Sequence, residues 1–215
     1  RDAGVPRGPS TSGDDMQHEA DQNTVKPDVG SLEAMLSRAA GEGLPPVDSW
    51  DPPYCGDLDI RIGRDGLWYY LGTPIGRDRL VRLFSTVLRR EADGRYYLVT
   101  PVEKIGITVD DVPFLAVELH VGGSGRDQTL TLRTNVGDVV TVGPDHPLRF
   151  APEPETEGVR PYVLVRRGLE ARLTRPLLFQ LVDAGSEETI DGEPWFGVWG
   201  GGRFFPMMRA AELAT

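Results

Sequence analysis

Polar side chains able to bind a ligand occur first between residues 55 and 62. Asp57, Asp59 and Arg61 alternate there with apolar residues, so on an extended strand all three point to one face. The two carboxylates could share a cation with His146, and a metal could then polarise a phosphoryl oxygen. The alternative is a solvated face on which Arg61 neutralises an aspartate. The sequence favours the solvated face, because no further carboxylate or histidine falls at metal-ligand spacing.

A second group of polar residues lies in the C-terminal half. Asn135, His146 and Arg149 could together read the edge of a base and hold a phosphate. Two of them also have structural alternatives, since Asn135 could form an Asx turn and His146 could order the loop that precedes it. Both interpretations stay open at this point. Arg160 and Arg203 are further candidates for binding an anion in this half.

Catalysis by a nucleophilic side chain is disfavoured. The chain has no Gly-x-Ser-x-Gly elbow, and its three histidines, one of them His18 near the start, offer little choice of general base. Cys55 could be a redox-sensing thiol. A small buried packing residue is the favoured interpretation, because the two nearby aspartates would raise the pKa of the thiol. We therefore predict no catalytic residue, no metal and no cofactor.

Composition narrows the class of protein. The 215 residues carry a formal charge of −10, which argues against a broad nucleic-acid-binding surface but leaves room for a nucleotide in a pocket. A hydrophobic content of 39% is enough for a sizeable core. A single cysteine cannot form an internal disulfide and fits a reducing compartment, so we expect a cytoplasmic protein. No apolar run is long enough to predict a membrane span, and no secretory leader is indicated.

The elements that position these side chains follow from hydrophobic periodicity. Residues 1–30 lack large apolar side chains and are predicted to be a disordered tail. Ser31 could cap a short helix, and Pro52, Pro53 and Gly56 form a corner before the strand that carries Asp57. A helix over 77–91 is the firmest prediction, because its apolar residues recur at helical spacing. Strands are predicted at 67–71, 96–99, 102–109 and 114–121.

The second half repeats this pattern of strands around a helix. Strands are predicted at 130–134, 139–142, 148–150, 162–165 and 169–173, with a short helix around Leu177 and a closing hairpin over 195–205. Short matching segments recur at a nearly constant offset, which indicates an internal duplication. We predict an α+β fold, mostly antiparallel, with a first domain over 31–121 and a second over 122–209.

Five segments in order resemble the uncharacterised bacterial family known as domain of unknown function 1285. They are residues 55–62, 71–75, 96–104, 134–136 and 146–150. The resemblance extends from about residue 50 to 207. It implies two structurally related domains, the second superficially like a pleckstrin-homology fold, with a ligand site where they meet. It also implies a signalling role, linked to oxidative stress and to a nucleotide-like or nucleic-acid-like ligand, but no activity and no site residues.

The leading functional hypothesis is a non-catalytic module that binds a small anionic, nucleotide-like ligand between its two domains. Its predicted ligand-binding residues are Asp57, Asp59, Arg61, Asn135, His146, Arg149, Arg160 and Arg203. A cleft between the domains could then offer donors to phosphate and acceptors to ring nitrogens. One alternative is a metal-dependent phosphoester hydrolase that uses Asp57, Asp59 and His146. Another is a protein-docking adapter, with Trp199 and its Gly-rich hairpin as the contact surface.

Overall fold

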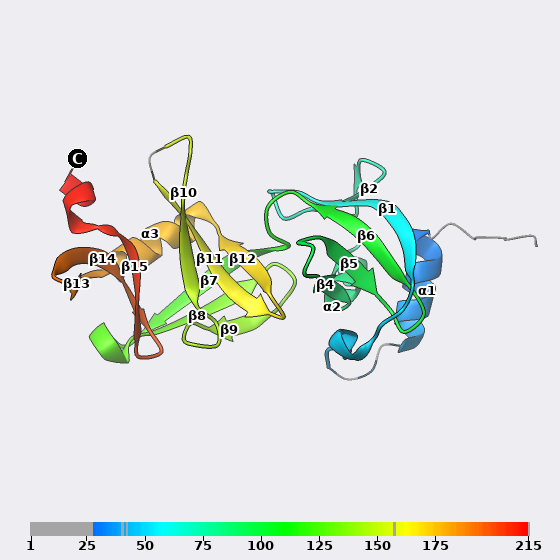
Figure 1. Cartoon of the computed structure of the whole chain (residues 1–215), viewed down its shortest axis with the longest axis horizontal. Helices are drawn as coiled ribbons and strands as arrows, with labels where there is room; N and C mark the ends of the chain where they lie inside the picture. The colour runs from blue at the N-terminus through cyan, green and yellow to red at the C-terminus, as the bar shows by residue number, and fades with distance from the viewer. Residues whose placement is uncertain (1–27, 40, 42, 157, 215) are drawn as a thin grey trace, which may run out of the picture.

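The structure is a computed structural model that describes residues 28–39, 41, 43–156 and 158–214. Two lobes lie side by side along the long axis, and the C-terminal end lies on the lobe away from α1 (Figure 1). Most of the predicted disordered tail, including His18, lies outside the described residues. No helix in the described ranges is long and apolar enough to cross a membrane.

The first domain is a six-stranded sheet with two helices. Its elements are α1 (Val29–Ala39), the 3-10 helix η1 (Val47–Ser49), β1 (Tyr54–Ile62), β2 (Trp68–Tyr70), β3 (Thr73–Pro74), α2 (Asp78–Thr86), β4 (Leu88–Arg90), β5 (Tyr96–Val99) and β6 (Lys104–Val109). The predicted alternation in β1 is confirmed, because Ile60 and Ile62 are buried while Asp57 and Asp59 are exposed.

The second domain has a six-stranded sheet, a helix and a three-stranded sheet. Its elements are β7 (Phe114–Gly122), η2 (Gly125–Asp127), β8 (Thr129–Thr134), β9 (Val139–Thr141), β10 (Leu148–Pro152), β11 (Val159–Arg166), β12 (Leu169–Leu173), α3 (Arg175–Asp183), β13 (Ser186–Ile190), β14 (Glu193–Gly200), β15 (Arg203–Arg209) and η3 (Ala210–Ala214). Strand β7 pairs with β8 and β12. The strand that the sequence placed at the end of the first domain thus belongs to the second sheet.

The two large sheets share one strand order. The first reads β3-β2-β1-β6-β5-β4 and the second, read from the other edge, β9-β8-β7-β12-β11-β10. In each, two three-stranded antiparallel meanders meet through a parallel pair, β1 with β6 and β7 with β12. The structure thus has two similar, mostly antiparallel domains, as predicted. Strands β1 and β7 thus occupy the same place in the two sheets.

Helices α1 and α2 differ from their predicted bounds. Helix α1 begins at Val29 rather than at a Ser31 cap, because Asp28 Oδ1 accepts hydrogen bonds from the amides of Gly30 and Ser31 at 2.8 and 3.0 Å. Helix α2 ends at Thr86, short of the predicted residue 91.

The early end of α2 has a local cause. The hydroxyls of Ser85 and Thr86 donate to carbonyls one turn back, which competes with continued helix formation. Residues 88–90 then pair with β5 as strand β4. Apolar residues just past the helix, such as Leu88, therefore reach the core from a strand.

The C-terminal hairpin packs as core. Trp199 and Phe205 are only 8% and 3% exposed. The side-chain amide of Gln128 donates to the Trp199 carbonyl, and the Trp199 indole donates to Glu188 at 2.9 Å. The protein-docking alternative required Trp199 to be a contact residue on the surface. Trp199 is mostly buried, so it offers little surface to a partner. Strand β13, which supplies Glu188, was not predicted.

Candidate functional site

Side chains of the second domain bind main-chain carbonyls of the first. Asn135 Nδ2 donates to the Gly66 carbonyl at 3.1 Å, and Arg172 Nη2 donates to the Arg64 carbonyl at 2.6 Å. Both acceptors lie in the loop between β1 and β2. Asn135 Oδ1 also accepts from the Leu115 amide at 3.0 Å. The side chain of Asn135 is thus used to fix the junction between the domains.

The turn between β11 and β12 makes two more contacts of this kind. Arg166 Nη2 donates to the Ser85 carbonyl at the end of α2, and Arg167 Nη2 donates to the Pro45 carbonyl, both at 2.8 Å. Arg166 also pairs with Asp138. Burial lowers the pKa of the Arg166 guanidinium, and Asp138 opposes that shift. The junction is therefore polar and rests largely on donors from one domain.

Charged and aromatic side chains also gather on the sheet face beside this junction. Arg149 makes two hydrogen bonds to Glu170, at 2.9 and 2.8 Å, and its guanidinium lies 4.2 Å from the ring centre of Tyr162. The Tyr162 hydroxyl donates to the carboxylate of Asp111 at 3.1 Å. Burial raises the pKa of Tyr162, and Asp111 adds to the shift. Arg149 is therefore engaged in a network of internal contacts.

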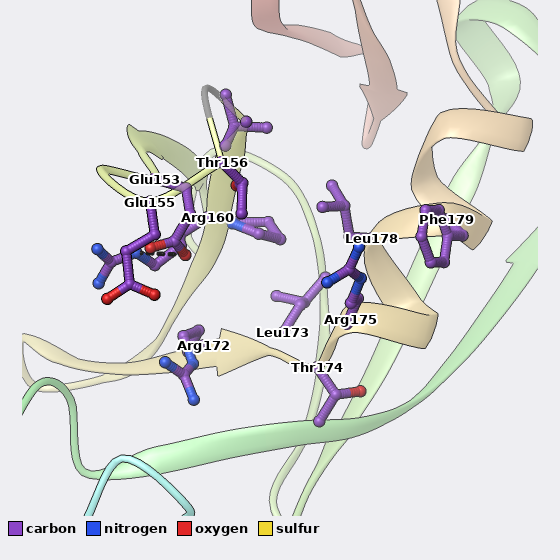
Figure 2. Close-up of a pocket in the computed structure, with 13 residues that line it drawn as sticks. Glu153, Glu155, Thr156, Arg160, Arg172, Leu173, Thr174, Arg175, Leu178 and Phe179 are labelled. Atoms are coloured by element: carbon purple, nitrogen blue, oxygen red, sulfur yellow. Dashed lines mark ion pairs between the residues drawn. The ribbon is translucent and has the colours of Figure 1, made fainter.

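A pocket of about 500 Å³ opens next to this network, between the β10–β11 hairpin and the start of α3. Glu153, Glu155, Arg160 and Arg172 line one side, and Leu178 and Phe179 lie on the other (Figure 2). All of its lining residues belong to the second domain, so this junction pocket lies beside the domain boundary rather than across it. The remaining lining residues are Thr156, Gly158, Val159, Pro161, Leu173, Thr174 and Arg175.

The three arginines of the junction pocket differ in what they already bind. Arg160 Nε lies 2.8 Å from Glu153 Oε2, which is the ion pair drawn in Figure 2. Arg172 Nη1 lies 3.8 Å from Asp111 Oδ2. Arg175 has no ion pair within the described ranges, and its guanidinium lies 5.8 Å from the ring centre of Phe179. The guanidinium of Arg175, and the N–H donors of Arg172 that make no hydrogen bond, thus remain able to bind an added anion.

The carboxylates of β1 lie apart from this pocket. Tyr54 donates to Asp57 Oδ1 at 2.8 Å, and Arg95 Nη2 lies 2.6 Å from the same atom. These two contacts lower the pKa of Asp57, the Tyr54 hydrogen bond contributing most. Arg61 pairs with Asp110 at 2.6 Å. In the part of the chain that the structure describes, neither ion pairs nor hydrogen bonds connect Asp57, Asp59 or Arg61 to the second domain.

The other predicted residues also occupy separate places. His146 Nδ1 lies 3.0 Å from the Leu164 carbonyl, within hydrogen-bond distance, which matches the loop-ordering alternative. Arg203 is an exposed residue at the start of β15, and its guanidinium lies 5.4 Å from the ring centre of Phe205. Over the described residues, no group of three or more histidine, cysteine or acidic residues is placed to hold a metal. Of the eight predicted residues, Arg160 lines the pocket and Arg149 lies in the network beside it.

The two pocket arginines that sequence reasoning missed are Arg172 and Arg175. They flank Leu173 and Thr174, and Thr174 is the N-cap of α3 with Pro176 in the first turn. A threonine followed by a proline before an apolar helix is a recognisable helix start. Two arginines beside a predicted helix start could therefore have indicated an anion site from the sequence alone.

Comparison with known proteins gives one consistent family. Residues 45–112 match "Domain of unknown function (DUF1285), N-terminal domain", and residues 113–207 match "Protein of unknown function (DUF1285), C-terminal domain". No curated protein matches the chain.

Two solved structures are similar to the chain. A DUF1285 family protein from Silicibacter pomeroyi DSS-3 is 49% identical, with a TM-score of 0.79 over 87% of this chain and 98% of that one. A DUF1285 family protein from Shewanella baltica OS155 is 27% identical, with a TM-score of 0.45 over 58% of this chain and 91% of that one. With both domain families matched in order and a structural relative that is 49% identical over 87% of this chain, the chain belongs to the DUF1285 family.

Proposed function

We propose that this chain is a cytoplasmic, non-catalytic regulatory module that binds a small anionic ligand in the junction pocket. The observation that carries the proposal is the lining of that pocket. Three arginines and two glutamates border a volume of about 500 Å³ in a chain of formal charge −10. A local excess of guanidinium groups in an acidic protein selects anions that the rest of the surface repels.

The expected ligand contacts follow from which donors of each arginine are already used by other groups. Arg175 supplies donors that no carboxylate of the described residues occupies, and Arg172 supplies those not used by the Arg64 carbonyl. Guanidinium groups bind carboxylate and phosphate through paired hydrogen bonds. Pro176 removes one amide donor from the first turn of α3, so the side chains rather than the helix end hold the anion.

The location of the pocket supports a regulatory role. Arg172 lines the pocket and also donates to the first domain. A ligand bound at Arg172 therefore interacts with one of the residues that join the two domains. Coupling between ligand binding and domain docking requires a contact whose energy differs between the ligand-bound and ligand-free states. The hydrogen bond from Arg172 to the Arg64 carbonyl is such a contact, so ligand binding in the pocket can affect domain docking through Arg172.

Thermal unfolding with three probes tests the proposal. Inorganic phosphate, AMP and octanoate are each titrated into the full chain and into two variants. We expect at least one probe to raise the melting temperature of the wild type, and Arg175→Ala to abolish that rise. Arg203→Ala is the matched control, because Arg203 also lies beside a phenylalanine ring without an ion pair in the described ranges. An unchanged melting temperature with every probe, or equal losses in both variants, would contradict the proposal.

A further inference from the structure

We propose that the ligand of the junction pocket is a single-chain amphiphile, with a carboxylate or phosphate head and an unbranched apolar chain. This inference rests on the proposed function and specifies the ligand class. It starts from the division of the pocket into two unlike sides. Glu153, Glu155 and Arg160 lie toward the β10–β11 hairpin, whereas Leu178 and Phe179 lie on α3, and Arg175 begins that helix (Figure 2).

The apolar side extends beyond the pocket along α3. Leu178 is partly buried, whereas Phe179 is 55% exposed and Val182 is 38% exposed. Residues three or four apart share a helix face, so Val182 continues the surface begun by Leu178 and Phe179. Exposed apolar side chains that adjoin a charged pocket leave surface that an apolar chain can cover.

The same side is poorly suited to a nucleobase. A base is held by hydrogen bonds to its edge and by stacking on an open aromatic face. Leu173, at the end of β12, and Leu178 and Phe179 on α3 have no side-chain donor or acceptor. The Arg175 guanidinium already lies 5.8 Å from the centre of the Phe179 ring. An alkyl chain needs neither contact, so the lining favours an alkyl chain over a base.

The head of the ligand belongs near Arg172 and Arg175. Arg175 begins α3, and Leu178 lies one turn further along the same helix. An anion held at Arg175 thus places an attached chain against Leu178 and Phe179. Glu153 and Glu155 on the opposite side repel a second anionic group there. The lining therefore selects one anionic end and one apolar end.

A series of chain lengths tests this inference. Isothermal titration calorimetry is run with inorganic phosphate, butyl, hexyl and octyl phosphate, and in parallel with acetate, butyrate, hexanoate and octanoate, all as monomers in solution. We expect affinity to rise up to about fourfold for each methylene that becomes buried, until the chain exceeds the apolar surface. The two series determine whether phosphate or carboxylate is the preferred head.

Two variants separate the head from the chain. Phe179→Ala should weaken octyl phosphate several-fold and leave inorganic phosphate unchanged, and Arg175→Ala should weaken both by the same factor. Val139→Ala is the control, because Val139 is an exposed apolar residue on β9, which lies at the other edge of the second sheet from β10.

The outcomes are distinguishable. If inorganic phosphate and AMP bind through Arg175 but octyl phosphate binds no more tightly than inorganic phosphate, the amphiphile inference is wrong and the proposed function stands. If no probe of either series binds, both are wrong. Binding to anionic phospholipid vesicles without binding of monomeric octyl phosphate would indicate a membrane surface and also overturn the inference.

Discussion

Arg172 of the second domain donates a hydrogen bond from Nη2 to the main-chain carbonyl of Arg64 in the first domain, at 2.6 Å. Because Arg172 also lines the junction pocket, the first domain fixes the orientation of a pocket side chain. The acceptor is a main-chain atom, so the contact depends on how the domains dock and not on the identity of residue 64. Domain docking and pocket geometry are thereby connected.

The first prediction concerns that connection. Arg167 contacts the Pro45 carbonyl at the junction but does not line the pocket. We expect Arg167→Ala to weaken binding of octyl phosphate by roughly fivefold or more, because loosening the junction frees Arg172 from its oriented position. Calorimetric titration measures the effect, and circular dichroism verifies that the variant is folded. Unchanged affinity in a folded Arg167→Ala protein would show that docking and binding are independent.

The second prediction concerns the stability of the junction. Arg166 pairs with Asp138 and donates to the Ser85 carbonyl, and its side chain is only 11% exposed. Arg166→Met should lower the free energy of unfolding by about 3 kcal/mol, because it leaves a shielded carboxylate unpaired. Adding Asp138→Asn should recover part of that loss. In the control Arg133→Ala, which breaks the exposed pair with Glu118, the loss should be below about 1 kcal/mol. Similar losses in both single variants would contradict this account.

The third prediction concerns the outer face of the first sheet. A Cβ atom on Gly106 would collide with the Asp57 carboxylate, which crosses the strand to meet Arg95. Gly106→Ala should therefore cost about 1–3 kcal/mol in urea unfolding. In an Asp57→Ala background the same change should cost much less, because the colliding group is gone. Equal costs in the two backgrounds would show that this collision is not the cause.

The fourth prediction uses the pH dependence of Glu103. Burial raises the pKa of its carboxyl, since the charged form is the one that loses solvation. The raised pKa means that the folded state disfavours the carboxylate, so Glu103 costs stability above its folded pKa and nothing below its unfolded pKa of about 4.3. Glu103→Gln should thus raise the melting temperature at pH 7 and leave it unchanged near pH 3.5. A gain of equal size at both pH values would point to a cause other than charge.

Local pattern was enough to predict most strands of this fold. The alternation from Leu58 to Ile62 specifies which face of β1 is buried, and that prediction depends only on neighbouring residues. Two features depended on distant partners. The pairs of β1 with β6 and β7 with β12 join segments far apart in the chain. Strand β13 has the sequence Ser-Glu-Glu-Thr-Ile, whose adjacent glutamates are poor strand formers.

The candidate site was harder to predict because its arginines come from two strands and a helix. Arg160 lies at the start of β11, and Arg172 lies near the end of β12. They reach one pocket because these two strands pair antiparallel, with Tyr162 opposite Arg172. From the sequence, all three of Arg149, Arg160 and Arg203 were equally good candidates for binding an anion, and only Arg160 lines the pocket. Arg149 is paired with Glu170 and stacked on Tyr162, and the sequence does not show that these residues are neighbours.

The most direct test of the central claim is a crystal structure of the chain grown with octyl phosphate. The account predicts electron density for the phosphate between Arg172 and Arg175, with the chain against Leu178 and Phe179. Phosphate density at Asp57 and Arg95 or at the Arg203 hairpin, with the junction pocket holding only water, would contradict it.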